Sequence, residues 1–164
     1  MTNPTANFLD SDAIDALVQR AAASPRRRLN LNLHPQLADP IQRFLNAGEP
    51  GTYVRPHRHQ AARWEMFAAL RGQMDVLLFA DDGALAQRIT LAPGCGVIEI
   101  AGGSWHSFVI MAPATVALEI KPGPYIAETD KEFAVWAPRE GEPGAERIVR
   151  WFETAHPGER WPTR

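Results

Sequence analysis

The chain has 164 residues, of which 45% are hydrophobic and 22% charged, and its formal net charge is −2. This composition is typical of a soluble globular protein, and its charge balance excludes a global field that would attract nucleic acid or an anionic membrane surface. The single cysteine, Cys95, excludes an internal disulfide and fits a reducing compartment. No apolar run approaches the roughly 20 residues of a membrane span, and no secretory signal opens the chain. We therefore expect a cytoplasmic protein with neither nucleic acid nor membrane as a partner.

The first predicted element is a helix over residues 11–23, "SDAIDALVQRAAA". Ser11 or Asp12 is expected to cap its start, and Ser24-Pro25 to end it. Its apolar residues recur at i, i+3, i+4 and i+7, which is the spacing of one helix face. They are Ile14, Leu17, Val18 and Ala21.

The two segments that follow differ in period. Residues 29–33, "LNLNL", alternate leucine with asparagine, which predicts a strand. Residues 39–48, "DPIQRFLNAG", predict instead a short helix with Gly48 as its C-cap.

From residue 51 to 122 nearly all of the chain favours strands. Short β-favouring runs such as "EMFAALRG", "AQRITLAPG" and "TVALEIKPG" are separated by glycine and proline turn signals. Many short strands at regular spacing predict an antiparallel sandwich or barrel. We expect an all-β single domain over residues 1–164, with a core barrel at about 29–122 and a C-terminal extension at 123–164. Within the extension, "GAERIVRWFETA" predicts a closing amphipathic helix.

The pair His57 and His59, in "TYVRPHRH", raises the question of a metal site. On a strand, side chains two residues apart share a face at about 7 Å, so Arg58 is expected to point the other way. Two such imidazoles can converge on one ion at metal–nitrogen distances of about 2.1 Å. The alternative is a surface or structural pair. On the same predicted face lie Tyr53 and Arg55.

Two residues on other predicted strands can complete the site. Glu65 begins the run "EMFAALRG", and His106 lies in "GGSWHSFVI". Three imidazoles and one carboxylate suit a first-row divalent ion with room for water or substrate. The alternatives are an ion pair of Glu65 with Arg63 or Arg71, and a polar core role for His106.

These residues resemble the two motifs of the cupin superfamily, a small antiparallel jelly-roll barrel. The first motif matches from Gly51 through the two histidines and Glu65 to Gly72, except that the five residues between His59 and Glu65 exceed the usual three or four. We expect a bulge or a longer turn to absorb the difference. The second motif is partial. Gly96, Gly103 and His106 are in place, whereas Ala101 and Ile110 stand where proline and asparagine are usual.

From about residue 24 to 141 the chain is similar to the WbuC-type cupin-fold metalloproteins. Members of that group are often associated with surface-polysaccharide gene clusters. It implies one divalent metal held by His57, His59, Glu65 and His106, with zinc, iron, nickel and manganese as candidates. It also implies a homodimer, because cupin barrels commonly pair through exposed strands.

Two classes of function follow. The first is a metal-dependent enzyme, of isomerase, epimerase or oxygenase type, that acts on a small polar substrate such as a sugar or sugar nucleotide. The metal would polarise a carbonyl or hydroxyl. Tyr53 and Arg55 would bind the substrate at the pocket mouth, with Arg55 orienting an anionic group; the alternative for Arg55 is a solvated edge arginine. The second class is a non-catalytic, metal-dependent binding or sensing protein. A metal-free epimerase is disfavoured, because it would not need all four ligands.

Two charged patterns remain open from the sequence. Arg26, Arg27 and Arg28 either reach an anionic ligand or form a solvated charge run, which is the favoured interpretation. Glu119 and Lys121 share one face of a predicted strand, and the pattern does not decide whether that face is pocket or solvent.

Overall fold

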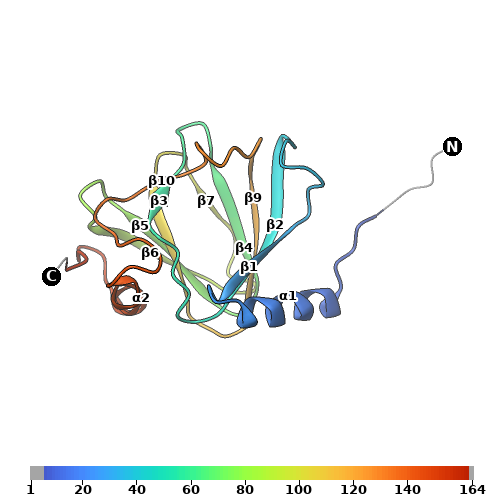
Figure 1. Ribbon diagram of the computed structural model, residues 1–164, viewed down its shortest axis with the longest axis horizontal. Helices are drawn as coiled ribbons and strands as arrows, with labels where there is room; N and C mark the ends of the chain where they lie inside the picture. The colour runs from blue at the N-terminus through green and yellow to red at the C-terminus, as the bar shows by residue number, and fades with distance from the viewer. Residues whose placement is uncertain (1–5, 163–164) are drawn as a thin grey trace.

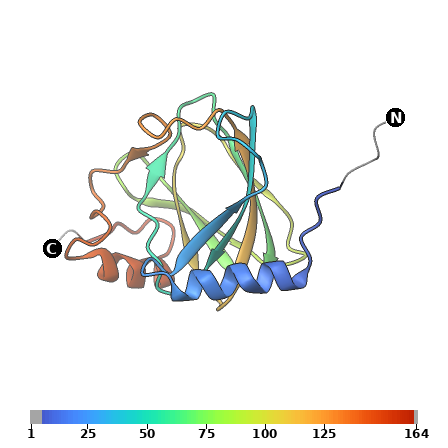
Figure 2. The same ribbon diagram turned by 45° about the vertical axis from the view of Figure 1, so that its right-hand side comes forward.

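The computed structural model describes residues 6–162, and within them two antiparallel five-stranded sheets face each other around a shared interior (Figures 1 and 2). The first sheet has the order β1 (Arg28–Asn32), β2 (Ile41–Gly48), β9 (Thr115–Pro122), β4 (Glu65–Arg71) and β7 (Ile98–Ile100). The second has the order β10 (Glu132–Phe133), β3 (His57–Arg58), β8 (Trp105–Ile110), β5 (Met74–Phe79) and β6 (Leu85–Leu91). The expected all-β jelly-roll architecture is confirmed.

The predicted N-terminal helix is α1, Ser11–Ala23, which runs along one end of the first sheet (Figure 2). Its N-cap is Asp10, not Ser11 or Asp12, because the extended backbone ends at Asp10 and its carboxylate accepts a hydrogen bond from the amide of Ala13 at 2.9 Å. The buried residues of this interface are Leu17, Ala21, Leu45, Ala47 and Val116.

The helix predicted at residues 39–48 is wrong, because Ile41–Gly48 form β2, paired with β1 and β9. Both faces of this strand are covered: Leu45 and Ala47 pack against α1, whereas Asn46 reaches the carboxylate of Glu119 on β9. A strand that is covered on both faces places apolar residues at adjacent positions, such as Phe44 and Leu45, which imitates helical spacing in the sequence.

The predicted C-terminal helix is α2, Ala145–Thr154, and it packs outside the second sheet. Ile148, Val149 and Phe152 are buried there, in a cluster with Tyr53 and Trp105. Within the described residues, neither α1 nor α2 is long and apolar enough to cross a membrane.

The interior of the barrel is apolar at one end and charged at the other. Along β9, Ala117 lies in an apolar cluster with Phe67, whereas Glu119 and Lys121 are buried among charged and polar groups. Along one face of β9 the side chains therefore change from apolar to charged. The buried charged groups around Glu119 and Lys121, which we call the polar chamber, lie next to the apolar core.

Candidate metal centre

Pairing with two strands that are distant in sequence positions the first histidine of the motif. Only His57 and Arg58 of the expected strand "TYVRPHRH" form regular structure, as β3. His57 pairs with His106 on β8 and, on its other side, with Phe133 on β10. As predicted, Arg58 points away: it donates to Glu132 at 2.7 and 2.9 Å and lies 4.4 Å over the ring of Trp105.

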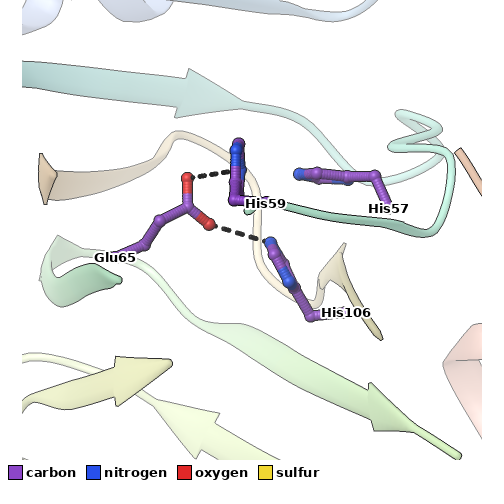
Figure 3. A group of neighbouring side chains, drawn as sticks. All are labelled: His57, His59, Glu65 and His106. Carbon is purple, nitrogen blue, oxygen red and sulfur yellow. Dashed lines mark ion pairs between the residues drawn. The ribbon is translucent and has the colours of Figure 1, made fainter. Parts of the chain in front are cut away.

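The structure brings together the four residues that the motifs single out. One ligand atom from each of His57, His59, Glu65 and His106 lies within 4.8 Å of the other three, and every one of these residues is at most 4% exposed. The Glu65 carboxylate lies between two imidazoles, 3.0 Å from His59 Nε2 and 2.9 Å from His106 Nε2 (Figure 3).

Backbone carbonyl groups fix the orientation of all three rings. His57 Nδ1 lies 2.9 Å from the carbonyl oxygen of Arg55, and His106 Nδ1 lies 2.9 Å from that of Ser104. His59 Nδ1 contacts the carbonyl oxygen of Asp130. A carbonyl oxygen only accepts, so each Nδ1 carries a proton and donates. In the neutral ring, each Nε2 then has a lone pair, which is the arrangement found in metal-ligating histidines.

The remaining polar atoms of the cluster fit a metal ion. His59 Nε2, His106 Nε2 and Glu65 Oε2 are buried without a hydrogen-bond partner among the described residues. Ligand atoms at about 2.1 Å from one ion are at most about 4.2 Å apart, so only a small contraction would gather them around it. Three nitrogens and a carboxylate match a borderline divalent ion of the first transition row.

Electrostatics keeps two members of the cluster in the forms that bind a metal. Burial lowers the pKa of His57 well below its usual range, and the nearby Lys131 adds to the effect, so the ring stays neutral. Burial alone would raise the pKa of Glu65, but in the metal-free protein His106 and His59, when their Nε2 atoms carry a proton, outweigh it through hydrogen bonds and charge and hold the pKa well below its usual range. Glu65 is therefore an anion beside neutral His57.

A turn at residues 60–63 absorbs the long gap between His59 and Glu65, as expected. It closes through a hydrogen bond from the amide of Arg63 to the carbonyl oxygen of Gln60 at 2.8 Å. Gly102 of the second motif packs directly against this turn, because a Cβ there would collide with the carbonyl oxygens of Gln60 and Ala61.

The sequence did not reveal a ring of buried charges next to the cluster. Lys121 Nζ lies 3.2 Å from Asp130, 3.5 Å from Glu65 and 3.8 Å from Glu119. Asp130 also lies 3.7 Å from Arg63. The face of β9 that carries Glu119 and Lys121 therefore faces the barrel interior and not solvent. The alternation of charged with apolar residues in "ALEIK" was the available signal, but it does not distinguish the two faces.

Opposite charges compensate one another within this ring. Burial alone would lower the pKa of Lys121, but Glu119, Glu65 and Asp130 outweigh it and raise the pKa. Burial and the charge of Glu65 raise the pKa of Glu119 to about 8. Lys131 keeps part of its surface in solvent, yet desolvation by the surrounding protein and the charge of Lys121 lower the pKa of its amine.

The two residues predicted to bind substrate do not lie in the cluster. Tyr53 is buried against Phe152 and donates to the carbonyl oxygen of Pro138 at 2.7 Å. Arg55 donates to the carbonyl oxygen of Ala134 at 2.7 Å and its guanidinium lies in a surface groove near α2. The expected shared face fails because residues 52–56 are not a strand, so their side chains do not alternate.

The three consecutive arginines have structural partners. Arg26 binds Glu140 through two hydrogen bonds of 2.7 and 2.8 Å, and Arg28 binds the same carboxylate at 3.0 Å. Arg27 donates to the carbonyl oxygen of Pro50 at 3.0 Å. These contacts tie the start of β1 to the C-terminal extension.

Comparison with protein families gives one match. The model of a family described as a domain of unknown function (DUF6016) covers residues 9–91, half of the chain. The chain belongs to the DUF6016 family. The matched stretch includes His57, His59 and Glu65, whereas His106 lies beyond it. No curated protein matches the sequence.

Solved structures share the fold of this DUF6016 chain. The capsular polysaccharide assembling protein CapF from Staphylococcus aureus is 16% identical over 63% of this chain and 31% of CapF, with a TM-score of 0.53. The DMSP lyase DddQ from Ruegeria pomeroyi DSS-3 is 18% identical over 65% of this chain and 51% of DddQ, with a TM-score of 0.51. A cupin_2 domain of an XRE family transcriptional regulator from Enterobacter cloacae is 19% identical, over 60% of this chain and 98% of that domain, with a TM-score of 0.48. The two facing five-stranded antiparallel sheets are the arrangement of a jelly roll.

Proposed function

We propose that this DUF6016 protein binds one divalent metal ion through His57, His59, Glu65 and His106 and acts as a metal-dependent enzyme on a small polar substrate. One observation carries the proposal: three backbone carbonyl groups orient three buried imidazoles so that their Nε2 atoms gather around one carboxylate. A purely structural cluster would not need Nε2 and carboxylate atoms that are buried without hydrogen bonds.

The chain itself supplies orientation and charge. A divalent ion at this centre would contribute Lewis-acid polarisation of a substrate carbonyl or hydroxyl, and open coordination positions. The backbone carbonyl of Asp130 holds the ring of His59 in place. The carboxylate of Asp130 binds the ammonium of Lys121, which in turn lies against the carboxylate of Glu65. Lys131, partly in solvent and electrostatically coupled to His57, replaces Arg55 as the cation that can orient an anionic group.

The charges of the chamber favour an anionic or strongly polar substrate. Lys121, Lys131 and Arg63 carry three positive charges, and the three carboxylates around Lys121 carry at most three negative ones. A bound divalent ion adds two positive charges, which an anionic ligand would compensate. Sugars and sugar nucleotides of surface-polysaccharide synthesis are our proposed substrate class. The resemblance to WbuC-type proteins supports it, and the description of CapF as a capsular polysaccharide assembling protein agrees with it.

Metal content tests the first half of the proposal. Protein purified without added metal, or reconstituted with zinc, iron, nickel or manganese, is expected to hold one ion per chain by elemental analysis. His57→Ala with His106→Ala should abolish this binding, whereas His156→Ala, at an exposed position, should not. A native protein that binds none of these metals would overturn the assignment.

A turnover screen tests the second half. The metal-loaded protein and its chelator-treated form are compared on sugar nucleotides and on small keto acids, with product formation followed by mass spectrometry. We expect isomerised, epimerised or oxygenated product only with metal present. Saturable, metal-dependent binding without any turnover would instead support the alternative of a binding or sensing protein.

A further inference from the structure

A groove on the surface next to α2 lies outside the metal centre and has no role in the proposed function. It encloses about 420 Å³ between the 135–144 segment, the start of α2 and Trp161. Volumes of roughly 300–1,000 Å³ are typical of small-molecule sites. The charged and aromatic residues of its lining are Arg55, Trp136, Arg139, Glu142, Arg147 and Trp161.

The lining is strongly cationic. Three guanidinium groups face one carboxylate, that of Glu142. Glu142 lies 3.8 Å from Arg139, and both side chains are about half exposed or more, so this pair leaves part of the charge of Arg139 available to a ligand. Arg147 lies over the ring of Trp161, at 5.5 Å from its centroid, which holds its guanidinium at the wall of the groove.

Two buried nitrogen atoms in the same wall are donors without acceptors. Arg55 Nε and Trp136 Nε1 are buried and have no hydrogen-bond partner among the described residues. Each is an N–H that can only donate, so the group that would satisfy them must be an acceptor. The residues that carry these donors line a groove whose charge is positive, and such a groove favours an anion.

The start of α2 adds to this preference. Its N-cap is Gly144, with φ at +104°, and no side chain of the described residues caps the first turn. The ten residues of α2 are long enough for the amides at its N-terminus to favour negative charge. The N-terminus of α2, the three arginines and the residues with unpaired donors thus all line the same groove.

We propose that this groove binds the phosphate group of a small phosphorylated molecule. A planar guanidinium binds two oxygens of a carboxylate or a phosphate at once, but a phosphate group also offers a third acceptor oxygen and a charge of about −2, so it can engage more than one of the arginines. Arg55, which the sequence placed beside the metal, belongs to this second site. The peptide from residue 55 to 57 connects the two sites, since His57 Nδ1 donates to the carbonyl oxygen of Arg55.

The test uses the full chain and three probes: inorganic phosphate, adenosine monophosphate and adenosine. Isothermal titration calorimetry measures binding, and tryptophan fluorescence reports it, because Trp136 and Trp161 line the groove. We expect both phosphate-bearing probes, and not adenosine, to bind saturably. Tighter binding of the nucleotide than of inorganic phosphate would show that the organic part is also held.

Matched variants locate the site. Arg147→Gln and Arg139→Gln should each weaken phosphate binding at least about fivefold, since each removes a charged donor. Arg150→Gln, on the same helix but outside the lining, should change it less than about twofold. Glu142→Gln should tighten it, because the only carboxylate among the described residues of the lining loses its charge. Circular dichroism verifies that each variant is folded.

The proposals for the metal centre and for the groove can be tested independently of each other. The His59→Ala, His106→Ala double variant, which leaves the contact between His57 and Arg55 in place, should lose metal and keep its phosphate affinity, whereas Arg147→Gln should keep its metal. Phosphate binding that disappears with the metal would assign the anion to the metal centre and overturn the groove. The absence of any saturable phosphate signal at millimolar concentration, or equal affinity in all four single variants, would also overturn it.

Discussion

His59 and Asp130 are joined across 71 positions of sequence by a contact from the imidazole Nδ1 to the backbone carbonyl oxygen. The side-chain carboxylate of Asp130 also pairs with Lys121, and the ammonium of Lys121 lies 3.5 Å from Glu65. One residue of the C-terminal extension therefore orients one candidate ligand directly and another through a lysine.

We predict that Asp130→Asn lowers metal affinity about tenfold, because it removes the carboxylate that holds Lys121 and leaves the ring contact intact. Competition with a chromophoric chelator measures the effect. Glu128→Gln, an exposed acid of the same loop, serves as the control and should leave the affinity unchanged. Equal affinities of wild type and Asp130→Asn would show that the carboxylate has no positioning role.

Metal should stabilise the folded protein, because the four donors gather only when distant segments of the chain have folded together. At a free metal concentration 100 times Kd, the expected gain in the free energy of unfolding is about 2.7 kcal/mol. Thermal melts with and without a chelator measure it. The His57→Ala, His106→Ala variant should melt at the same temperature in both conditions.

Glu119 makes the stability of the metal-free protein depend on pH. Because its pKa is raised from 4.5 to about 8, the folded state keeps a proton that the unfolded state releases between these values. Stability therefore falls as pH rises through this window, by up to about 1.4 kcal/mol per pH unit. Glu119→Gln should flatten this dependence and raise stability at pH 8, while it keeps an acceptor for Asn46.

Urea denaturation of the metal-free protein between pH 5 and pH 8 tests this sign. Glu99→Gln, at an exposed position of β7, is the control and should follow the wild-type pH profile. A Glu119→Gln variant that is less stable than wild type at pH 8 would contradict the assigned burial of a protonated carboxyl group.

Gly102 is expected to tolerate no side chain, because a Cβ would collide with two carbonyl oxygens of the 60–63 turn. Gly102→Ala should cost about 2 kcal/mol or more in stability and weaken metal binding, since the turn leads from His59 to Glu65. Gly94→Ala meets no atom within 4 Å, so its cost is limited to its positive φ of +81°, about 1 kcal/mol. Denaturation midpoints and metal titrations of the two variants measure the difference.

The sequence predicted those features that depend on local pattern. The helix at residues 11–23 and the strand at residues 29–33 show their period directly, because each has one face exposed. Segment 39–48 was predicted wrongly, because β2 is covered by α1 on one face and by the barrel interior on the other. The polar residues Gln42, Arg43 and Asn46 fall on both faces of β2, so the segment shows no clean period of two.

By itself, the sequence predicted the candidate donor set: two histidines one residue apart, a glutamate six residues on, and a histidine at the start of a distant strand. Side-chain type and the spacing of the two motifs indicate this set, even though His59 follows the short strand β3 and is not itself on a strand. Only the tertiary structure decided that Glu119 and Lys121 face the interior, that Asp130 supports His59, and that Arg55 turns toward α2. Each of these depends on which segment, distant in sequence, covers a given face, and no local pattern of residues carries that information.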